Sequence, residues 1–168
     1  MIVTFATENY KKYLIMLLDS YFYFNSDKKA KVYLIEWTKD SFLNISKQYQ
    51  NVSFEEIKAG EAIREKASRN KRVGEILKKK PELIFNFYKN TNDPFLWVDA
   101  DSIILDNINP LLKKLDNKNI DLMCTHRPNH HKDHAKFAVA VLGFGNHANG
   151  KIFLKEYANI TKKCDGVK

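Results

Sequence analysis

The sequence predicts an α/β fold: one domain over residues 1–168, with a mostly parallel central sheet flanked by helices. Two observations predict it. Short runs that are apolar at nearly every position alternate along the chain with longer segments whose apolar residues follow the helical period. Such runs are typical of parallel strands that are covered on both faces. No internal repeat and no linker divides the chain, so a single domain is expected.

The predicted elements alternate between strand and helix as far as the fourth strand, which implies right-handed crossovers. Strands are expected at 2–6, 32–35, 52–54, 95–98, 121–125 and 137–144, and helices at 10–24, 41–50, 70–88, 109–115 and 148–163. Pro81 should kink or split the helix over 70–88, because proline lacks the amide hydrogen that a helix interior uses. In the last helix the residues expected to pack inward are Ile152, Phe153 and Tyr157.

The composition limits the classes of function. The formal net charge of +8 fits a nucleic acid, an anionic membrane surface or a nucleotide-sugar as partner, and equally a solvated basic surface with no partner. Two cysteines are too few for a disulfide framework or a zinc site, so reduced thiols and a cytoplasmic location are expected. The apolar run from Tyr13 to Phe24 is too short for a bilayer and contains Asp19, and the first residues do not form a signal peptide.

Two aspartates end the fourth predicted strand. Asp99 and Asp101 follow the apolar run 95–98, and a second apolar run, 103–105, follows them. Because side chains alternate along a strand, the two carboxylates should point the same way. Carboxylates held side by side repel unless a positive charge lies between them, and Mg²⁺ or Mn²⁺ would supply it while leaving positions open for phosphate oxygens. The pair is therefore a candidate metal site for a nucleotide diphosphate.

A second candidate site follows the first strand. Ligands of open α/β sheets bind at the carboxyl ends of the strands. There Thr7 and Asn9 could bond a base or ribose, and Tyr10 could stack on the base. The alternative is that Thr7 or Asn9 only caps the next helix. The turn has no Gly-rich dinucleotide fingerprint and no Gly-Lys-Ser/Thr loop, so phosphate binding would depend on a metal and on cationic side chains.

These motifs together resemble the glycosyltransferases of the GT-A fold, a Rossmann-like group that uses nucleotide-diphosphosugar donors. Residues 95–108 are similar to that group's strand–DxD–strand pattern, and the first two strands resemble its nucleotide-binding half. Residues 121–128 and 137–146 resemble the later part of the fold. The resemblance implies a UDP- or GDP-sugar as donor, a glycan or other hydroxyl as acceptor, and Mn²⁺ or Mg²⁺ as cofactor.

The resemblance also implies a role for each matching residue. Asp101 would bind the metal directly, and Asp99 would bind the ribose, the metal or both. The nucleoside would be held by the first turn, through Thr7, Asn9 and Tyr10. A basic residue before the aspartates would meet the diphosphate or the sugar, and the candidates are Arg69, Arg72 and Lys80. A solvated basic face is the alternative for each of these three residues.

The chain departs from the group's pattern in two places. Ala140 stands where the later strand of the group often has Gly, so the sugar pocket could differ. The chain is also short for the group, whose members often carry a late metal-binding His, and His147 is the candidate here. An inverting enzyme needs a carboxylate base. Asp133 is the only acidic residue in the segment 127–136 and is the candidate for that base.

Two other classes of protein compete with this interpretation. A nucleotidyltransferase would share a related fold and metal chemistry, but such enzymes usually open with a Gly-rich loop, and residues 7–10 contain no Gly. A basic nucleic-acid-binding module would explain the charge and the many aromatic residues. The basic residues are spread along the chain, however, and no RNA- or DNA-binding motif is recognisable, so nucleic acid is not the expected partner.

Overall fold

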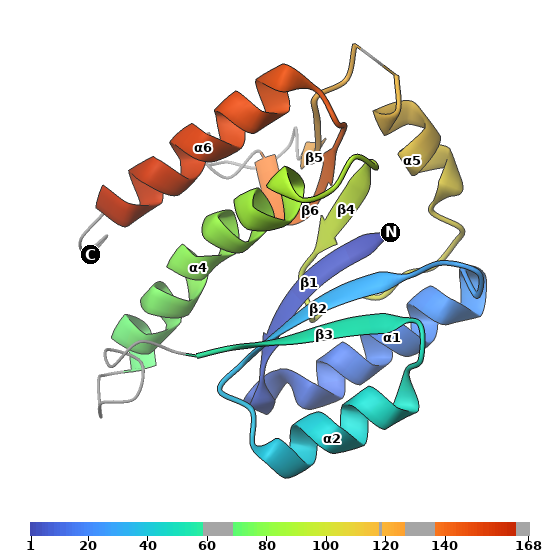
Figure 1. The fold of residues 1–168 in the computed structure, drawn as a ribbon, viewed down its shortest axis with the longest axis vertical. Helices are drawn as coiled ribbons and strands as arrows, with labels where there is room; N and C mark the ends of the chain where they lie inside the picture. The colour runs from blue at the N-terminus through green and yellow to red at the C-terminus, as the bar shows by residue number, and fades with distance from the viewer. Residues whose placement is uncertain (59–68, 118, 127–136, 164–168) are drawn as a thin grey trace.

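A six-stranded, mostly parallel sheet forms the centre of the described part of the protein (Figure 1). The computed structural model describes residues 1–58, 69–117, 119–126 and 137–163. The strands are β1 (Ile2–Thr7), β2 (Ala30–Ile35), β3 (Val52–Ile57), β4 (Phe95–Val98), β5 (Leu122–His126) and β6 (Phe137–Phe144). Their order is β3-β2-β1-β4-β6-β5, and β6 runs antiparallel to β4 and β5. The fold class that the sequence predicts is confirmed.

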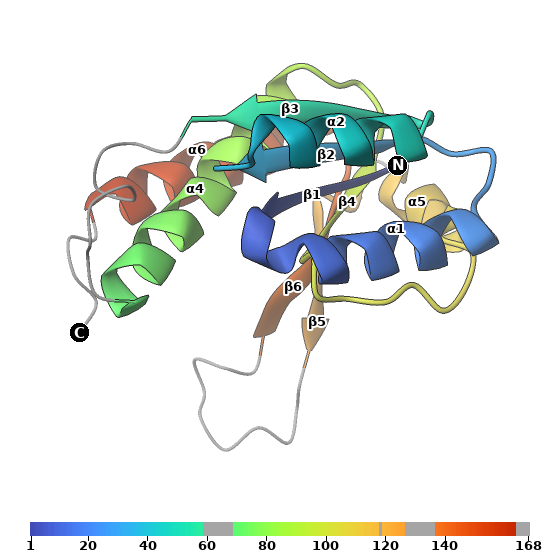
Figure 2. The same ribbon diagram turned by 90° about the horizontal axis from the view of Figure 1, so that it is seen from below.

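Helices cover both faces of the sheet (Figure 2). One face carries α1 (Lys11–Phe24), α2 (Lys39–Gln48) and α5 (Asn109–Leu115). The other face carries α4 (Arg69–Lys89) and α6 (Ala148–Lys163). A 3₁₀ turn, η1 (Glu8–Tyr10), joins β1 to α1. None of the helices in the described ranges combines the length and the apolar character that crossing a bilayer requires.

Alternation of side chains along the strands creates a hydrophobic core on each face. In β1, Ile2 and Ala6 pack on the side of α1, whereas Val3 packs on the side of α4. Trp97 of β4 also lies on the α4 side and is fully buried. Because both faces are covered, the central strands β1, β2 and β4 are apolar at nearly every position, and this is the pattern by which the sequence reveals them.

Of the two outcomes expected at Pro81, a kink or a split, the split does not occur. α4 runs as one helix over Arg69–Lys89 with Pro81 inside it (Figure 1). The lost hydrogen bond is tolerated because the following turns are anchored: Leu83, Ile84 and Tyr88 are buried against the sheet. Tertiary packing therefore outweighs the local preference of proline.

The inward face of α6 differs in part from the expected one. Ile152 is 62% exposed and Phe153 is 45% exposed, whereas Tyr157 packs against the core as expected, together with the buried Leu154 and Ala158. Gly150 packs closely on Tyr88 of α4, with its Cβ position only 2.7 Å from the Tyr88 hydroxyl oxygen. Small residues therefore mark the side of α6 that approaches α4, and a search for large apolar residues does not detect them.

Tyr88 joins α4 to the turn after β6. Its hydroxyl accepts a hydrogen bond from the amide of His147 at 3.0 Å and lies within bonding distance of the carbonyl oxygens of Gly145 and His147. Gly145 has no room for a side chain, since a Cβ there would overlap the carbonyl oxygens of Ile120 and Leu115. This turn therefore requires glycine at position 145.

Gly145→Ala should destabilise the fold, whereas Gly74→Ala should not. Because the obstructing atoms belong to the backbone, we expect Gly145→Ala to lower the free energy of unfolding by about 2–4 kcal/mol. Gly74 of α4 has no described atom within 4 Å of its Cβ position. Alanine there should raise the free energy of unfolding by roughly 0.5–1 kcal/mol, because glycine is a poor helix former. Urea denaturation of both variants is the measurement, and equal effects would contradict this account.

Candidate functional site

A pocket of about 170 Å³ lies at the carboxyl ends of β1 and β4. These strands are parallel neighbours, with Val3 paired to Trp97, so the chain leaves both at the same edge of the sheet. Helix α4 forms another side of the pocket. The lining residues are Phe5, Ala6, Thr7, Tyr10, Ile76, Lys80, Asp99, Ala100 and Asp101. The structure therefore brings together several of the residues that the sequence singled out, namely Thr7, Tyr10, Lys80, Asp99 and Asp101.

Two side chains hold the carboxylate of Asp99. Lys80 Nζ lies 2.6 Å from Asp99 Oδ1, and the indole Nε1 of Trp97 donates to the same oxygen at 3.1 Å. Lys80 is only 4% exposed, and its Nζ lies 5.8 Å from the centre of the Trp97 ring. Lys80 therefore supplies, at Asp99, the positive charge that the sequence assigned to a metal ion. The sequence indicated Lys80 as a candidate ligand of the diphosphate or the sugar and did not reveal this pairing.

Asp101 lies in a tight turn rather than on a strand. β4 ends at Val98, and the amide of Ser102 donates to the carbonyl oxygen of Asp99 at 3.0 Å, which closes the turn. Strand alternation therefore does not set the relative directions of Asp99 and Asp101, and the strand placement expected for Asp101 is wrong. The turn nevertheless brings both residues to the pocket, where Asp101 is exposed.

No second strand follows the aspartates. Residues 102–107 form neither helix nor strand. The amide of Ile104 donates instead to the hydroxyl of Ser20 on α1 at 3.0 Å, so the segment is held by a helix rather than by a sheet edge. The structure therefore contains the first strand and the two aspartates of the strand–DxD–strand pattern, but not its second strand.

The first βα turn presents Thr7 and Tyr10 to the pocket. Thr7 occupies the N-cap of η1 and Tyr10 that of α1, and neither side chain makes a capping hydrogen bond. The capping role considered for Thr7 is therefore not observed. The Tyr10 ring is 46% exposed and lies 5.6 Å from the ring of Tyr13. Asn9 is exposed and does not line the pocket.

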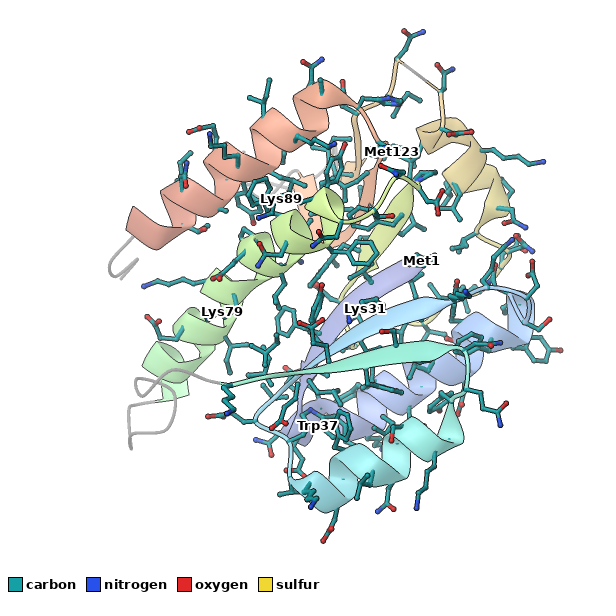
Figure 3. All side chains as sticks on the ribbon, viewed as in Figure 1. Met1, Lys31, Trp37, Lys79, Lys89 and Met123 are labelled. Carbon is teal, nitrogen blue, oxygen red and sulfur yellow. The ribbon has the colours of Figure 1, made fainter. Side chains whose placement is uncertain are left out.

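Glu8, which is absent from the predicted site, fastens the first turn to α2. Its Oε1 accepts from the Thr38 hydroxyl at 2.9 Å and its Oε2 from the Thr38 amide at 3.2 Å. The Thr38 hydroxyl oxygen in turn caps α2 by accepting from the Ser41 amide at 3.4 Å. The indole of Trp37, labelled in Figure 3, donates to the carbonyl oxygen of Ala6 at 2.9 Å. Glu8 and Thr38 lie 30 positions apart, and Ala6 and Trp37 lie 31 apart, so no local sequence pattern reveals these two contacts.

His147 does not join the pocket. Phe144, three positions before it, pairs with Phe95 at the start of β4, whereas the aspartates follow the end of that strand. The His147 Nε2 lies 3.1 Å from the carbonyl oxygen of Asn117. His147 is therefore at the wrong edge of the sheet to share an ion with Asp101. The candidates whose side chains or backbone lie outside the described part of the chain are Arg69, Arg72 and Asp133.

The carboxylates of the pocket suit a hard cation. The Oδ2 of Asp99 and both oxygens of Asp101 make no hydrogen bond or ion pair with described residues. They are the oxygen ligands that Mg²⁺ and Mn²⁺ prefer. No cluster of three His, Cys, Asp or Glu side chains suited to a metal occurs in the described ranges. The site therefore fits an ion that takes its remaining ligands from water and phosphate, not a closed all-protein site.

The same fold occurs in glycosyltransferases of known structure. The galactosyltransferase LgtC, solved in complex with donor and acceptor sugar analogs, matches 98% of this chain with a TM-score of 0.64 and 17% identity. The glycosyltransferase GlyE of Streptococcus pneumoniae TIGR4 matches 96% with a TM-score of 0.59 and 17% identity. Mouse xyloside xylosyltransferase 1 matches 96% with a TM-score of 0.56 and 8% identity.

The chain spans 66% of LgtC, 38% of GlyE and 70% of the xylosyltransferase. No protein-family model matches the sequence, and no curated protein does. The architecture is therefore that of the GT-A glycosyltransferases. Identity this low establishes the fold alone.

Asp99→Asn and Asp101→Asn should differ in their effect on stability. Asp99→Asn removes the carboxylate that neutralises the buried ammonium of Lys80, so we expect a loss of about 1–3 kcal/mol, reduced because the Asp99 side chain is one-third exposed. Asp101 has no such partner among the residues that the structure describes, and its loss should change stability by less than about 0.5 kcal/mol. Chemical denaturation near neutral pH is the measurement. Equal losses would show that the ion pair with Lys80 does not stabilise the fold.

The pKa of Glu8 lies below its usual range, chiefly because the hydroxyls of Ser41 and Thr38 donate to its carboxylate. A lowered pKa means that these bonds stabilise the fold above the pKa of an unfolded glutamate, and that this stabilisation is lost as pH falls through the folded pKa. Ser41→Ala should raise the pKa of Glu8, whereas Ser46→Ala, on the same helix, should leave it unchanged. A carboxyl-carbon NMR titration measures both, and an unmoved Glu8 in Ser41→Ala protein would refute the assignment.

Proposed function

We propose that this chain binds a nucleotide-diphosphosugar and acts as a metal-dependent glycosyltransferase on an acceptor hydroxyl. The observation that carries the proposal is the pocket in which Lys80, Asp99 and Asp101 meet Thr7 and Tyr10. An ammonium, two carboxylates, a hydroxyl and an aromatic ring at the carboxyl edge of a parallel sheet offer a group for each part of a nucleoside diphosphate. The likeness of the fold to LgtC and GlyE supports the same class.

Each side chain is assigned the role that its position allows. The Tyr10 ring would stack on the base, and the Thr7 hydroxyl would bond the ribose. Asp101 would bind the metal directly, and the free Oδ2 of Asp99 would bind the metal or the ribose. Lys80 would meet the diphosphate. The 170 Å³ of the pocket is below the roughly 300–1,000 Å³ of typical ligand sites, so it would hold only part of the donor.

The contribution of the chain to transfer would be electrostatic. Asp101 and the free Oδ2 of Asp99 would hold a Mn²⁺ or Mg²⁺, which would supply Lewis-acid stabilisation of the leaving group. Lys80 Nζ, which is shielded from water, would donate to a phosphate oxygen as negative charge develops on the departing nucleoside diphosphate. Since Trp97 donates to the same oxygen of Asp99 as Lys80 does, Asp99 keeps one donor and its orientation when Lys80 turns to the phosphate.

A thermal-shift comparison of uridine and guanosine diphosphate, each with Mn²⁺, Mg²⁺ or EDTA, tests the proposal. At 100 times Kd a ligand stabilises the folded state by about 2.7 kcal/mol. In a chain of this size that should raise Tm by roughly 5–10 °C. We expect the rise for at least one of the two nucleotides, and only with a divalent cation present.

The variant Asp101→Asn separates a specific site from general ion binding. We expect it to abolish the cation-dependent rise in Tm, while Asp116→Asn, which removes an exposed carboxylate at the end of α5, leaves the rise intact. An equal rise in EDTA, or an undiminished one in Asp101→Asn protein, would refute the metal-bridged site. A salt-dependent rise with an oligonucleotide that Asp101→Asn does not alter would favour the nucleic-acid-binding alternative instead.

A further inference from the structure

The outward side of α1 and the segment after the aspartates form one exposed apolar surface. We call this surface the α1 face, and its large side chains are Tyr13, Met16, Tyr23, Phe24, Ile103 and Leu105. Tyr23 is 81% exposed and Leu105 is 80% exposed. The segment lies along the helix in Figure 2, and it is fastened there because the Asn107 side chain donates to the carbonyl oxygen of Phe24 at 3.3 Å.

The size of the α1 face indicates a binding surface rather than scattered exposed residues. Given their exposed fractions, its side chains offer on the order of 800 Å² of area, about what one partner contributes to a standard interface of roughly 1,600 Å². Contiguous exposed apolar patches beyond a few hundred Å² are uncommon on soluble monomers. Tyr, Met and Phe are also the residue types enriched in the centres of protein–protein interfaces.

The charges on the α1 face decide what it fits. Lys12 and Asp19 lie seven positions apart on the outward side of α1, with Met16 between them, and both are exposed. The carboxylates of Asp19 and of Asp106, which is exposed on the segment, disfavour an anionic bilayer, and the opposite charges of Lys12 and Asp19 on the helix favour neither an acidic nor a basic partner. A surface that carries both signs at symmetric places is complementary to itself. Self-complementarity is the requirement for a twofold interface.

We infer that the α1 face pairs with the α1 face of a second copy of this chain, with the two helices antiparallel and Met16 at the twofold axis. In that arrangement position 12 of one helix falls opposite position 20 of the other, so Lys12 lies within one residue of Asp19 of the second copy. Helical rise makes that offset about 1.5 Å along the axis, which a lysine side chain spans. The symmetry repeats the contact, so each interface contains two such ion pairs.

The same register places a side chain from the second copy beside the pocket. Position 23 falls opposite position 9, so Tyr23 of the second copy would lie against Asn9, next to Tyr10 at the edge of the pocket. Asn9 has no partner among the described side chains and does not line the pocket of a single chain. The pairing does not depend on the proposed sugar transfer, so the two proposals can fail separately.

Sedimentation velocity of the full chain measures the pairing. We expect a species of twice the 19.6 kDa chain mass that dissociates on dilution from about 0.2 mM, where a micromolar Kd leaves most chains paired. Met16→Arg should abolish this species, because two guanidinium groups would meet at the axis. Leu43→Arg is the matched control, since Leu43 on α2 is 42% exposed and Met16 is 41% exposed. It should leave the pairing intact.

Charge reversal tests the antiparallel register. Lys12→Glu and Asp19→Lys should each weaken the pairing roughly tenfold, because each replaces two opposite-charge contacts by two like-charge ones. The double variant should restore it. Since Asp19 also accepts a hydrogen bond from the Tyr49 hydroxyl at 2.7 Å, Tm of each variant should be recorded as a check on folding.

Three results would overturn the inference. A single species of one chain mass at about 0.2 mM would exclude a micromolar twofold pair. A dimer that Met16→Arg leaves intact would show that another surface forms it. Cosedimentation of monomers with vesicles of phosphatidylcholine and phosphatidylglycerol, lost in Met16→Arg protein, would assign the α1 face to a membrane surface.

Discussion

The ion pair between Lys80 and Asp99 is the interaction on which the arrangement of the site depends. An ammonium that is 4% exposed needs a counter-charge, because an unpaired buried charge is strongly unfavourable. Asp99 at the end of β4 provides it at 2.6 Å. That contact ties α4 to the end of β4, and Ile76, one turn earlier on the same helix, lines the pocket wall. It adds to the packing of Leu83, Ile84 and Tyr88, which holds the following turns of α4 against the sheet.

The topology of the sheet gathers the remaining groups at the same edge. Because β1 and β4 are adjacent and parallel, the first βα turn and the aspartate turn emerge side by side. The first half of the antiparallel strand β6 also lies at this edge, beside the end of β4. There the carbonyl oxygen of Ala140 accepts a hydrogen bond from the amide of Asp99 at 2.8 Å. Ala140, which stands where a Gly would match the GT-A pattern, therefore holds the backbone at the first aspartate. A shift of the β6 backbone at Ala140 would therefore move the backbone of Asp99.

The features that could be predicted from the sequence are those set by residues close together along the chain. Strands and helices were predicted because the periodicity of apolar residues records burial on one or both faces. The pocket was predicted because parallel strands place their carboxyl ends together. The pairing of Lys80 with Asp99 and that of Glu8 with Thr38 escaped prediction, because each joins residues 19 or 30 positions apart without any local pattern. Pro81 does not split α4 because the packing of the following turns against the sheet outweighs local preference. Ile152 was misjudged because Leu154 and Ala158 form the buried side of α6.

The charges of the pocket favour the proposed divalent cation even with Lys80 present. Asp99 and Asp101 carry two negative charges and Lys80 carries one positive charge, so the three groups together are negative. A diphosphate would bring further negative charge to the same 170 Å³. The excess positive charge of the chain, +8 overall, helps little at a distance, since salt screens charges beyond about 8 Å. An ion of charge +2 held by Asp101 and Asp99 Oδ2 would reverse the sign of the summed charge of these three side chains, which would favour the diphosphate. If it then drew Lys80 from Asp99 to the phosphates, nucleotide and metal would bind with positive cooperativity, each weakly alone and tightly together.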